Sequence, residues 1–144
     1  MSDAVDTARI ARDALELVCS GKDADAVACH YHPEFVDHVN GSTFHGHEGV
    51  RKSVAFYEAL LEDLQFTVDD QVTEGDKVAS RFTVRGTREG RTIELHGIVI
   101  SRFRDGLIIE DFAVSDSLEL MRQLGPRRLL TLVVKEWRTL LSHR

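Results

Sequence analysis

The hydrophobic periodicity of the chain changes near residue 65, and this change constrains the fold more than any other feature. Before it, apolar residues recur every three or four positions in residues 5–18 and 48–64, which predicts amphipathic helices. A short helix is expected between them, over residues 23–31, with its end set by Pro33. After the change, apolar and polar residues alternate with a period of two, as in half-buried strands. The chain is therefore expected to form helices first and a sheet second.

Four strands are predicted after the change in period, because three short polar runs that contain glycine separate the alternating segments. Such runs are typical of tight reversals between antiparallel strands, and they lie at residues 74–76, 88–90 and 104–106. The strands are expected over residues 66–74, 78–85, 92–103 and 107–114. A helix follows, capped by Asp116 or Ser117 and stopped by the glycine and proline at 125–126.

Helices followed by an antiparallel meander indicate an α+β fold, with the helices packed on one face of the sheet. The apolar runs at residues 98–100 and 107–109 make both faces of the predicted sheet apolar. One face can cover the helices and a pocket, and the other needs a partner, most simply a second copy of the chain. We therefore expect a homodimer that forms through the sheet.

The chain is expected to form one domain, because 144 residues are about the length of a single domain. Residues 1–125 would form its body, and residues 126–144 a C-terminal helical extension of the same domain. The extension has a broad apolar face, which needs something to pack against. That partner could be the core, the mouth of a pocket, the dimer interface or another protein such as a carrier domain.

Composition argues against several classes of partner. The net charge of −6 disfavours nucleic acid, whose phosphates are bound by clustered Lys and Arg. No apolar run approaches the roughly 20 residues that a membrane span needs. The first residues are polar and acidic and lack the apolar stretch of a signal peptide, so a cytoplasmic location is expected.

Neither a metal nor an organic cofactor is predicted. Five histidines fall within residues 30–47, but they lack the helical i, i+4 spacing of a metal-binding pair. The chain also has no glycine-rich loop of the kind that binds phosphates, which disfavours a nucleotide cofactor.

Several short segments occur in a characteristic order along the chain. They are YHPEFVDH at residues 31–38, HGHEGVR at 45–51, GDKVA at 75–79, RGT at 85–87 and the run at 96–112. In this order and spacing they resemble the SnoaL-like polyketide cyclases of the nuclear-transport-factor-two-like superfamily, over residues 5–125. The resemblance implies a cone-shaped α+β barrel: three N-terminal helices packed on a curved antiparallel sheet that encloses a deep pocket, here with an extra C-terminal helix. It also implies cofactor-free chemistry on polyketide-type molecules.

Asp111 is the first candidate catalytic residue. In the aldol cyclases of this family an acid stands in the last strand, and the resemblance places Ala113 at that position and Val99 where those cyclases carry a histidine. Asp111 lies two residues before Ala113 and therefore on the same face of the strand. Apolar surroundings would raise its pKa toward a value useful for proton transfer. The alternative is a structural carboxylate held by an arginine or by backbone donors.

His38 is the second candidate catalytic residue, because the resemblance places its segment at the pocket wall. A neutral imidazole oriented by Asp37 could accept a proton there, although a loop histidine in solvent is the alternative. Tyr57 could offer its hydroxyl to a carbonyl, or serve as a core residue. The predicted substrate-binding residues are Tyr57, Arg81, Val99, Ser101 and Ala113.

The predicted function is that of a cofactor-independent cyclase or isomerase, which closes a ring in an apolar polyketide-type intermediate. The chemistry could be acid–base or pericyclic, such as a (4+2) cycloaddition promoted by holding a polyene in a folded conformation. A non-catalytic module that binds small molecules is the alternative, because a fold does not determine a function.

Overall fold

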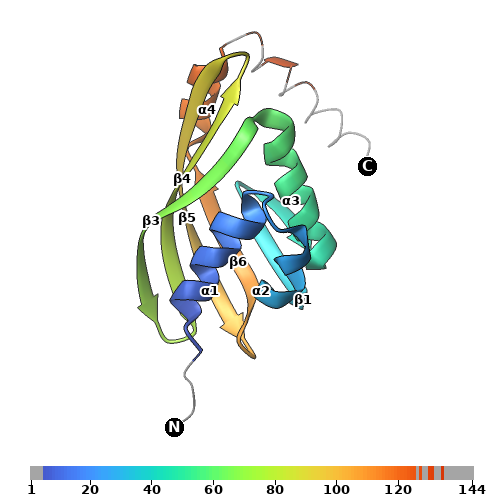
Figure 1. Cartoon of the computed structure of the whole chain (residues 1–144), viewed down its shortest axis with the longest axis vertical. Helices are drawn as coiled ribbons and strands as arrows, with labels where there is room; N and C mark the ends of the chain where they lie inside the picture. Colours follow the sequence, from blue (N-terminus) through green and yellow to red (C-terminus); the bar gives the residue numbers. More distant parts are fainter. Residues whose placement is uncertain (1–4, 126, 128–129, 132–133, 135–144) are drawn as a thin grey trace.

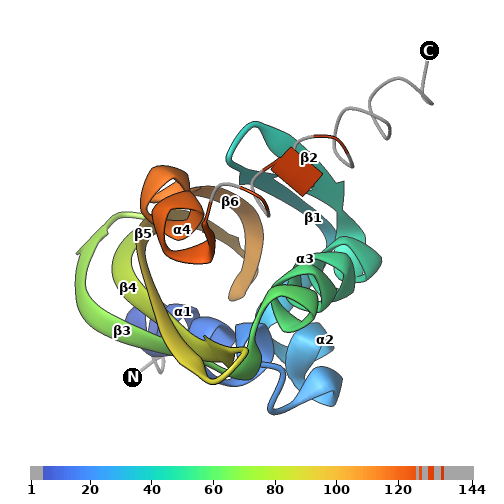
Figure 2. The same cartoon turned by 90° about the horizontal axis from the view of Figure 1, so that it is seen from above.

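The computed structural model describes residues 5–125 and residues 127, 130, 131 and 134. A curved six-stranded sheet wraps around helices that lie on its inner face (Figure 1). Seen from above, α3 (Gly46–Leu60) stands opposite the curve of the sheet, and α1 (Thr7–Asp13) lies inside it (Figure 2). This arrangement confirms the predicted α+β fold with helices on one face. The predicted C-terminal extension, residues 126–144, lies outside the described residues except for four positions.

The three predicted N-terminal helices are present, with local departures from regular α-helix. Asp6 caps α1 by accepting a hydrogen bond from the backbone N–H of Arg9 at 3.0 Å. The same helix continues as a π-helical segment, η1 (Ala14–Cys19), so the helix expected over residues 5–18 is one element with two geometries. The short second helix is a 3₁₀ turn, η2 (Ala24–Ala26), followed by α2 (Val27–His30).

The sheet contains two strands that the sequence analysis did not predict. They are β1 (Tyr31–Val39) and β2 (Ser42–His45), and most of this segment lies between the predicted helices at 23–31 and 48–64. The hairpin between them turns at Asn40 and Gly41, whose φ values of 46° and 86° are those of a type I′ turn. An Asn-Gly pair adopts these angles readily, which explains why strands can flank it.

The strand order is β2-β1-β6-β5-β4-β3, so β1 lies beside the last strand. The other strands are β3 (Glu62–Glu74), β4 (Lys77–Arg88), β5 (Arg91–Arg104) and β6 (Leu107–Ser115). The pairing of β1 with β6 is parallel, whereas all others are antiparallel, so the expectation of a wholly antiparallel sheet was wrong at this junction. The reason is that β1 joins the edge of the meander from a distant part of the chain.

Irregularities in the ladders bend the strands inward. The register shifts between Glu62 and Gln65, between Val68 and Asp70, and between Arg102 and Phe103. Such bulges increase the local twist and bend the strand that carries them. The sheet therefore curves around its inner face without closing, and β2 and β3 form its edges.

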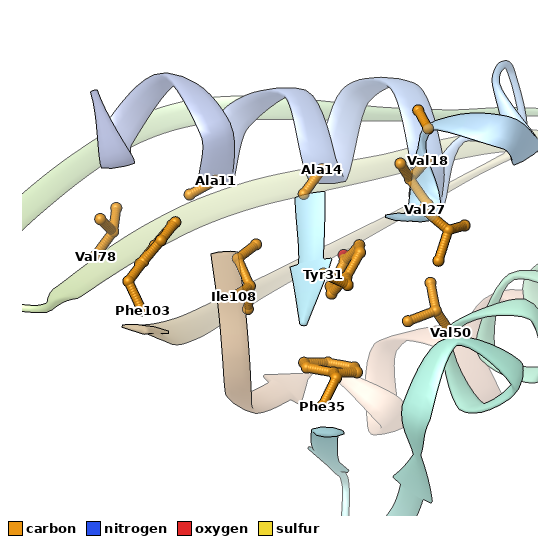
Figure 3. Packing of buried hydrophobic residues seen from close by; sticks show 11 residues of the cluster. Ala11, Ala14, Val18, Val27, Tyr31, Phe35, Val50, Val78, Phe103 and Ile108 are labelled. Atoms are coloured by element: carbon orange, nitrogen blue, oxygen red, sulfur yellow. The ribbon is translucent and has the colours of Figure 1, made fainter. Parts of the chain in front are cut away.

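One core cluster fills the end of the cone where the first helices meet β1, β5 and β6. Figure 3 shows Ala11 and Ala14 above Tyr31, Phe35 and Ile108. The small alanine side chains let the helix lie close to the sheet. A second cluster, which includes Phe66, Phe82 and Leu95, lies between β3, β4 and β5. Helix α4 (Ser117–Leu124) packs against β5.

Gly97 marks a close approach within the sheet. A Cβ atom at this position would lie 2.5 Å from Cζ of Phe82 and 2.8 Å from the carbonyl oxygen of Val114. We expect Gly97→Ala to lower the free energy of unfolding by about 1–3 kcal/mol, because the backbone oxygen cannot move without shifting β6. Urea denaturation measures this loss. Arg104→Ala, at an exposed position of the same strand, should leave the midpoint unchanged. An equally stable Gly97→Ala protein would contradict the close approach.

Candidate functional site

A cavity lies between the inner face of the sheet and the helices η1 and α3. It holds about 520 Å³ of unfilled space, which includes the part that opens to solvent. Most of its wall is apolar, with Phe66, Phe82 and Val99 among the lining residues. Polar side chains interrupt the apolar wall at a few points: Cys19, Tyr31, Asp37, Ser53, Tyr57 and Asp111. This composition suits a largely apolar ligand that is oriented by a few polar contacts.

Asp111 on β6 faces the cavity, as predicted. Its side chain is 8% exposed, and its Oδ1 atom has no hydrogen-bond partner in the described part of the chain. Burial raises the pKa of Asp111 to about 8, the negative charge of Asp37 adds to the rise, and a hydrogen bond with Ser101 opposes it. The carboxyl group is therefore mostly protonated at neutral pH and can donate a hydrogen bond into the cavity.

Asp37 is a cavity residue that the sequence analysis mentioned only as a support for His38. It lies directly beside Asp111 in the parallel ladder between β1 and β6, and it is 7% exposed. Burial raises its pKa to about 6, and the neighbouring His38 opposes this rise. The usable signal was the alternation of Phe35, Asp37 and Val39, three cavity-lining residues at a spacing of two.

His38 does not face the cavity, so its predicted position at the pocket wall was wrong. Its Nε2 atom lies 3.1 Å from Oε2 of Glu110, and its ring stacks on Phe112 with the ring centroids 4.5 Å apart. Because side chains alternate along a strand, the face opposite Asp37 is the outer face of the sheet. His38 is therefore separated from the cavity by the backbone of β1.

The five predicted substrate-binding residues also divide between the cavity side and the outer face of the sheet. Tyr57, Val99 and Ala113 line the cavity. Ser101 is buried beside Asp111 as its partner in the β5–β6 ladder. Arg81 lies on the outer face, where its Nε donates to Asp70 at 3.0 Å, so its placement in the pocket was also wrong. The roles of the remaining four residues in binding stay predictions.

The other polar groups of the cavity are neutral hydrogen-bonding groups. The Sγ atom of Cys19 lies 3.7 Å from Oη of Tyr31. Burial raises the pKa of Cys19 to about 12 and that of Tyr31 well above its ordinary value, and it also raises the pKa of Tyr57. A thiol this weakly acidic is a poor nucleophile at neutral pH. The cavity thus offers hydrogen-bond donors and one carboxyl pair, a set suited to proton transfer.

The described residues were also compared with the requirements of a metal site and of a membrane-spanning helix. No three side chains of the metal-binding types come together in them. The histidines point to separate places; His30 contacts the carbonyl oxygen of Ala26 and His47 that of Tyr31, both at 2.7 Å. No helix in the described ranges has the length and apolar character to cross a bilayer. The absence of a metal or cofactor stays a prediction.

Comparison with known proteins assigns the chain to a family. The family model of the SnoaL-like domain matches residues 11–111, which include both cavity aspartates. The chain belongs to the SnoaL-like family. Among curated proteins, none matches its sequence closely.

Solved structures agree with this SnoaL-like assignment. IdmH from Streptomyces antibioticus, a proposed polyketide cyclase, is 27% identical with a TM-score of 0.73, over 84% of this chain and 99% of that chain. TsrD from Streptomyces laurentii is 30% identical with a TM-score of 0.69, over 83% and 92% of the two chains. AclR from Streptomyces galilaeus, a proposed hydroxylase, is 25% identical with a TM-score of 0.68, over 83% and 97%. The SnoaL-like resemblance inferred from the sequence is confirmed.

Proposed function

We propose that this SnoaL-like protein is a cofactor-independent cyclase or isomerase that closes a ring in an apolar, polyketide-type intermediate. One observation carries the proposal: the buried carboxyl group of Asp111 faces a mostly apolar cavity, and one of its oxygen atoms has no hydrogen-bond partner among the described residues. The similarity to IdmH, itself a proposed polyketide cyclase, supports the choice of substrate class.

The cavity would act first by holding a flexible chain in a folded conformation. Bringing two reacting carbons together in this way removes part of the entropic barrier to ring closure. Asp111 would donate a hydrogen bond to a carbonyl oxygen of the bound molecule and increase its reactivity. Tyr57, on the opposite wall, would orient the same molecule. This scheme serves both an acid–base cyclisation and a pericyclic one.

A substitution that fills the cavity tests whether it is the binding site. We expect Ala113→Phe to weaken binding of an uncharged apolar dye such as Nile red by about 10- to 100-fold, because the added ring occupies the space that a ligand needs. Fluorescence titration gives the affinity. Val114→Phe is the matched control, because Val114 is the next residue on β6 and is 64% exposed. Equal affinities of the two variants would place the binding site elsewhere.

A non-catalytic binding module remains the second candidate, and one observation favours it. The family resemblance places Ala113, which has no polar group in its side chain, at the position of the acid in the aldol cyclases. A protein that binds polyketide-type molecules in the cavity and never accelerates their conversion would be such a module. Turnover assays with linear polyketide intermediates, run beside the binding assay, distinguish the two functions.

We also propose that the protein forms a homodimer through the outer face of the sheet. This face carries a row of apolar side chains that runs across β3, β4, β5 and β6: Val72, Ala79, Ile100 and Phe112 occupy successive ladder positions. Ile98 and Val114 form a second pair beside the row. We call these six residues the outer-face patch. Its larger members are 43–72% exposed in a single chain, and a second copy would cover them.

A further inference from the structure

Asp37 and Asp111 form a buried carboxyl pair with no arginine or lysine beside it in the described part of the cavity wall. They are direct neighbours in the parallel β1–β6 ladder, and both line the cavity. Ser101 alone hydrogen-bonds to Asp111, and the described residues include neither an arginine nor a lysine in the cavity wall. Two buried carboxyl groups side by side with no cation are unfavourable for stability when both are charged. An arrangement of this kind calls for a functional explanation.

We infer that Asp37 and Asp111 act as a base and an acid on the two ends of one group, a carbonyl with a C–H bond on the adjacent carbon. Asp37 would remove the proton from that carbon, and Asp111 would protonate or hydrogen-bond the carbonyl oxygen. This inference rests on the proposed function and specifies its substrate class, an enolisable ketone or β-dicarbonyl compound.

The environments of the two carboxyl groups assign these roles. The pKa of Asp37 is raised to about 6 and that of Asp111 to about 8, so near neutral pH the first is mostly ionised and the second mostly protonated. Asp111 is the more strongly perturbed because it also bears the repulsion of the Asp37 charge. A pair of titratable groups whose pKa values are pushed apart is the usual arrangement for an acid and a base in one site.

Among the described residues around the pair, no other group competes for either role. The titratable side chains that face it from neighbouring elements are kept neutral by burial: Cys19 on η1, Tyr31 on β1 and Tyr57 on α3. On the other face of the sheet His38 opposes the rise in the pKa of Asp37, and its partner Glu110 also binds Arg102. These outer groups are separated from the cavity by the backbone.

The proposed proton transfers balance without a cofactor. The C–H bond breaks, its proton goes to the Asp37 carboxylate, and its electron pair forms the C=C bond of an enol as Asp111 protonates the carbonyl oxygen. The enol carbon then attacks a second carbonyl carbon of the same folded molecule, forming the ring bond. The first oxygen returns its proton to Asp111, and Asp37 gives its proton to the second oxygen. Substrate and product are isomers, and both carboxyl groups return to their initial states.

The first test asks whether the two carboxyl groups interact. Carbon-13 NMR of labelled aspartates follows each titration in the full-length protein. We expect Asp37→Asn to lower the pKa of Asp111, because it removes the neighbouring charge, whereas Asp70→Asn, at an exposed carboxyl on β3, should leave it unchanged. An Asp111 pKa that is the same in wild type and Asp37→Asn would overturn the inference.

The second test measures the chemistry with β-tetralone, an apolar ketone with an acidic C–H bond, as the probe. Proton NMR in heavy water follows exchange at the carbon beside the carbonyl. We expect the wild-type rate to be highest near neutral pH, between the two pKa values, and to fall by about 100-fold or more in Asp37→Asn. At pH values below the optimum the exchange rate should decrease because Asp37 becomes protonated, and at pH values above it the rate should decrease because Asp111 becomes ionised. Asp70→Asn should exchange at the wild-type rate.

Displacement of Nile red by β-tetralone, measured on the same samples, separates the two proposals. Binding without accelerated exchange, or exchange that survives Asp37→Asn, would overturn the acid–base pair and leave the binding cavity in place. The pericyclic form of the proposed function would then be favoured. Failure to bind both β-tetralone and Nile red would overturn the pair and the proposed function together.

Discussion

Asp111→Asn should remove most of the pH dependence of stability between about pH 6 and pH 8. In the unfolded chain an aspartate is already ionised above its ordinary pKa of 3.8, whereas in the folded protein Asp111 holds its proton up to about pH 8. The folded state therefore binds one more proton than the unfolded state over this range. The free energy of unfolding must fall as pH rises, by about 1.4 kcal/mol per pH unit.

The two aspartates contribute over different ranges. The stability that Asp37 contributes is lost as the pH rises from its ordinary pKa of 3.8 to its folded pKa of about 6. The stability that Asp111 contributes is lost over a wider range, up to its folded pKa of about 8. Between about pH 6 and pH 8 the wild type should lose on the order of 2 kcal/mol through Asp111, and Asp111→Asn should lose almost none of this. Asparagine has the shape of the protonated acid and cannot ionise, so the variant should be as stable as the wild type under mildly acidic conditions.

Urea denaturation across this pH range, at a fixed protein concentration, measures the effect. The matched control is Asp70→Asn, whose carboxyl group is 66% exposed beside Arg81 and which should keep the wild-type slope. A wild-type stability that stays constant or rises over this range would mean that Asp111 is ionised in the folded protein. The acid role assigned to it would then be wrong.

The local part of the fold was predictable from the sequence, and the non-local part was not. Strands β3 to β6 follow from alternation and from tight turns such as the one at Asp105 and Gly106, because each hairpin needs only neighbouring residues. The parallel contact between β1 and β6 joins residues more than 70 positions apart, such as Asp37 and Asp111. No periodicity within either segment specifies that partner. The Asn-Gly turn after β1 was a local signal that could have identified the hairpin.

The candidate site shows how a shift of one residue along a strand changes which side chain lines the cavity. Asp111 was placed correctly because its face followed from Ala113, two positions away in a strand that had been recognised. No strand was predicted for the segment with Asp37 and His38, so the alternation of side chains was not applied to it, and His38 was chosen because the resemblance places the segment at the pocket wall. Because the segment is a strand, the adjacent side chains of Asp37 and His38 must point to opposite faces of the sheet. A shift of one residue in the register would exchange the side chain in the cavity for the one on the outer face. In the structure Asp37 lines the cavity and His38 lies on the outer face.

Placing a lysine in the outer-face patch should convert the proposed homodimer to a monomer. Ile100 and Phe112 are direct partners on β5 and β6, they are 43% and 50% exposed, and within the outer-face patch they connect the rest of the apolar row to the second pair. We expect Ile100→Lys or Phe112→Lys to weaken association by about 100-fold or more, because a charge buried at the centre of an interface loses its hydration without a partner. Neither change reaches the cavity, so the affinity for Nile red should be unchanged.

Sedimentation velocity at micromolar concentration measures the shift from dimer to monomer. Leu118→Lys on α4 is the matched control, because Leu118 is 77% exposed and lies outside the patch. A wild-type protein that sediments as a monomer would refute the dimer. Dissociation by Leu118→Lys with no effect of Ile100→Lys would move the interface away from the sheet. If the patch variants dissociate and still bind Nile red, the two faces of the sheet have separate tasks: the residues that point outward assemble the protein, and their alternating neighbours Ser101, Asp111 and Ala113 form the site.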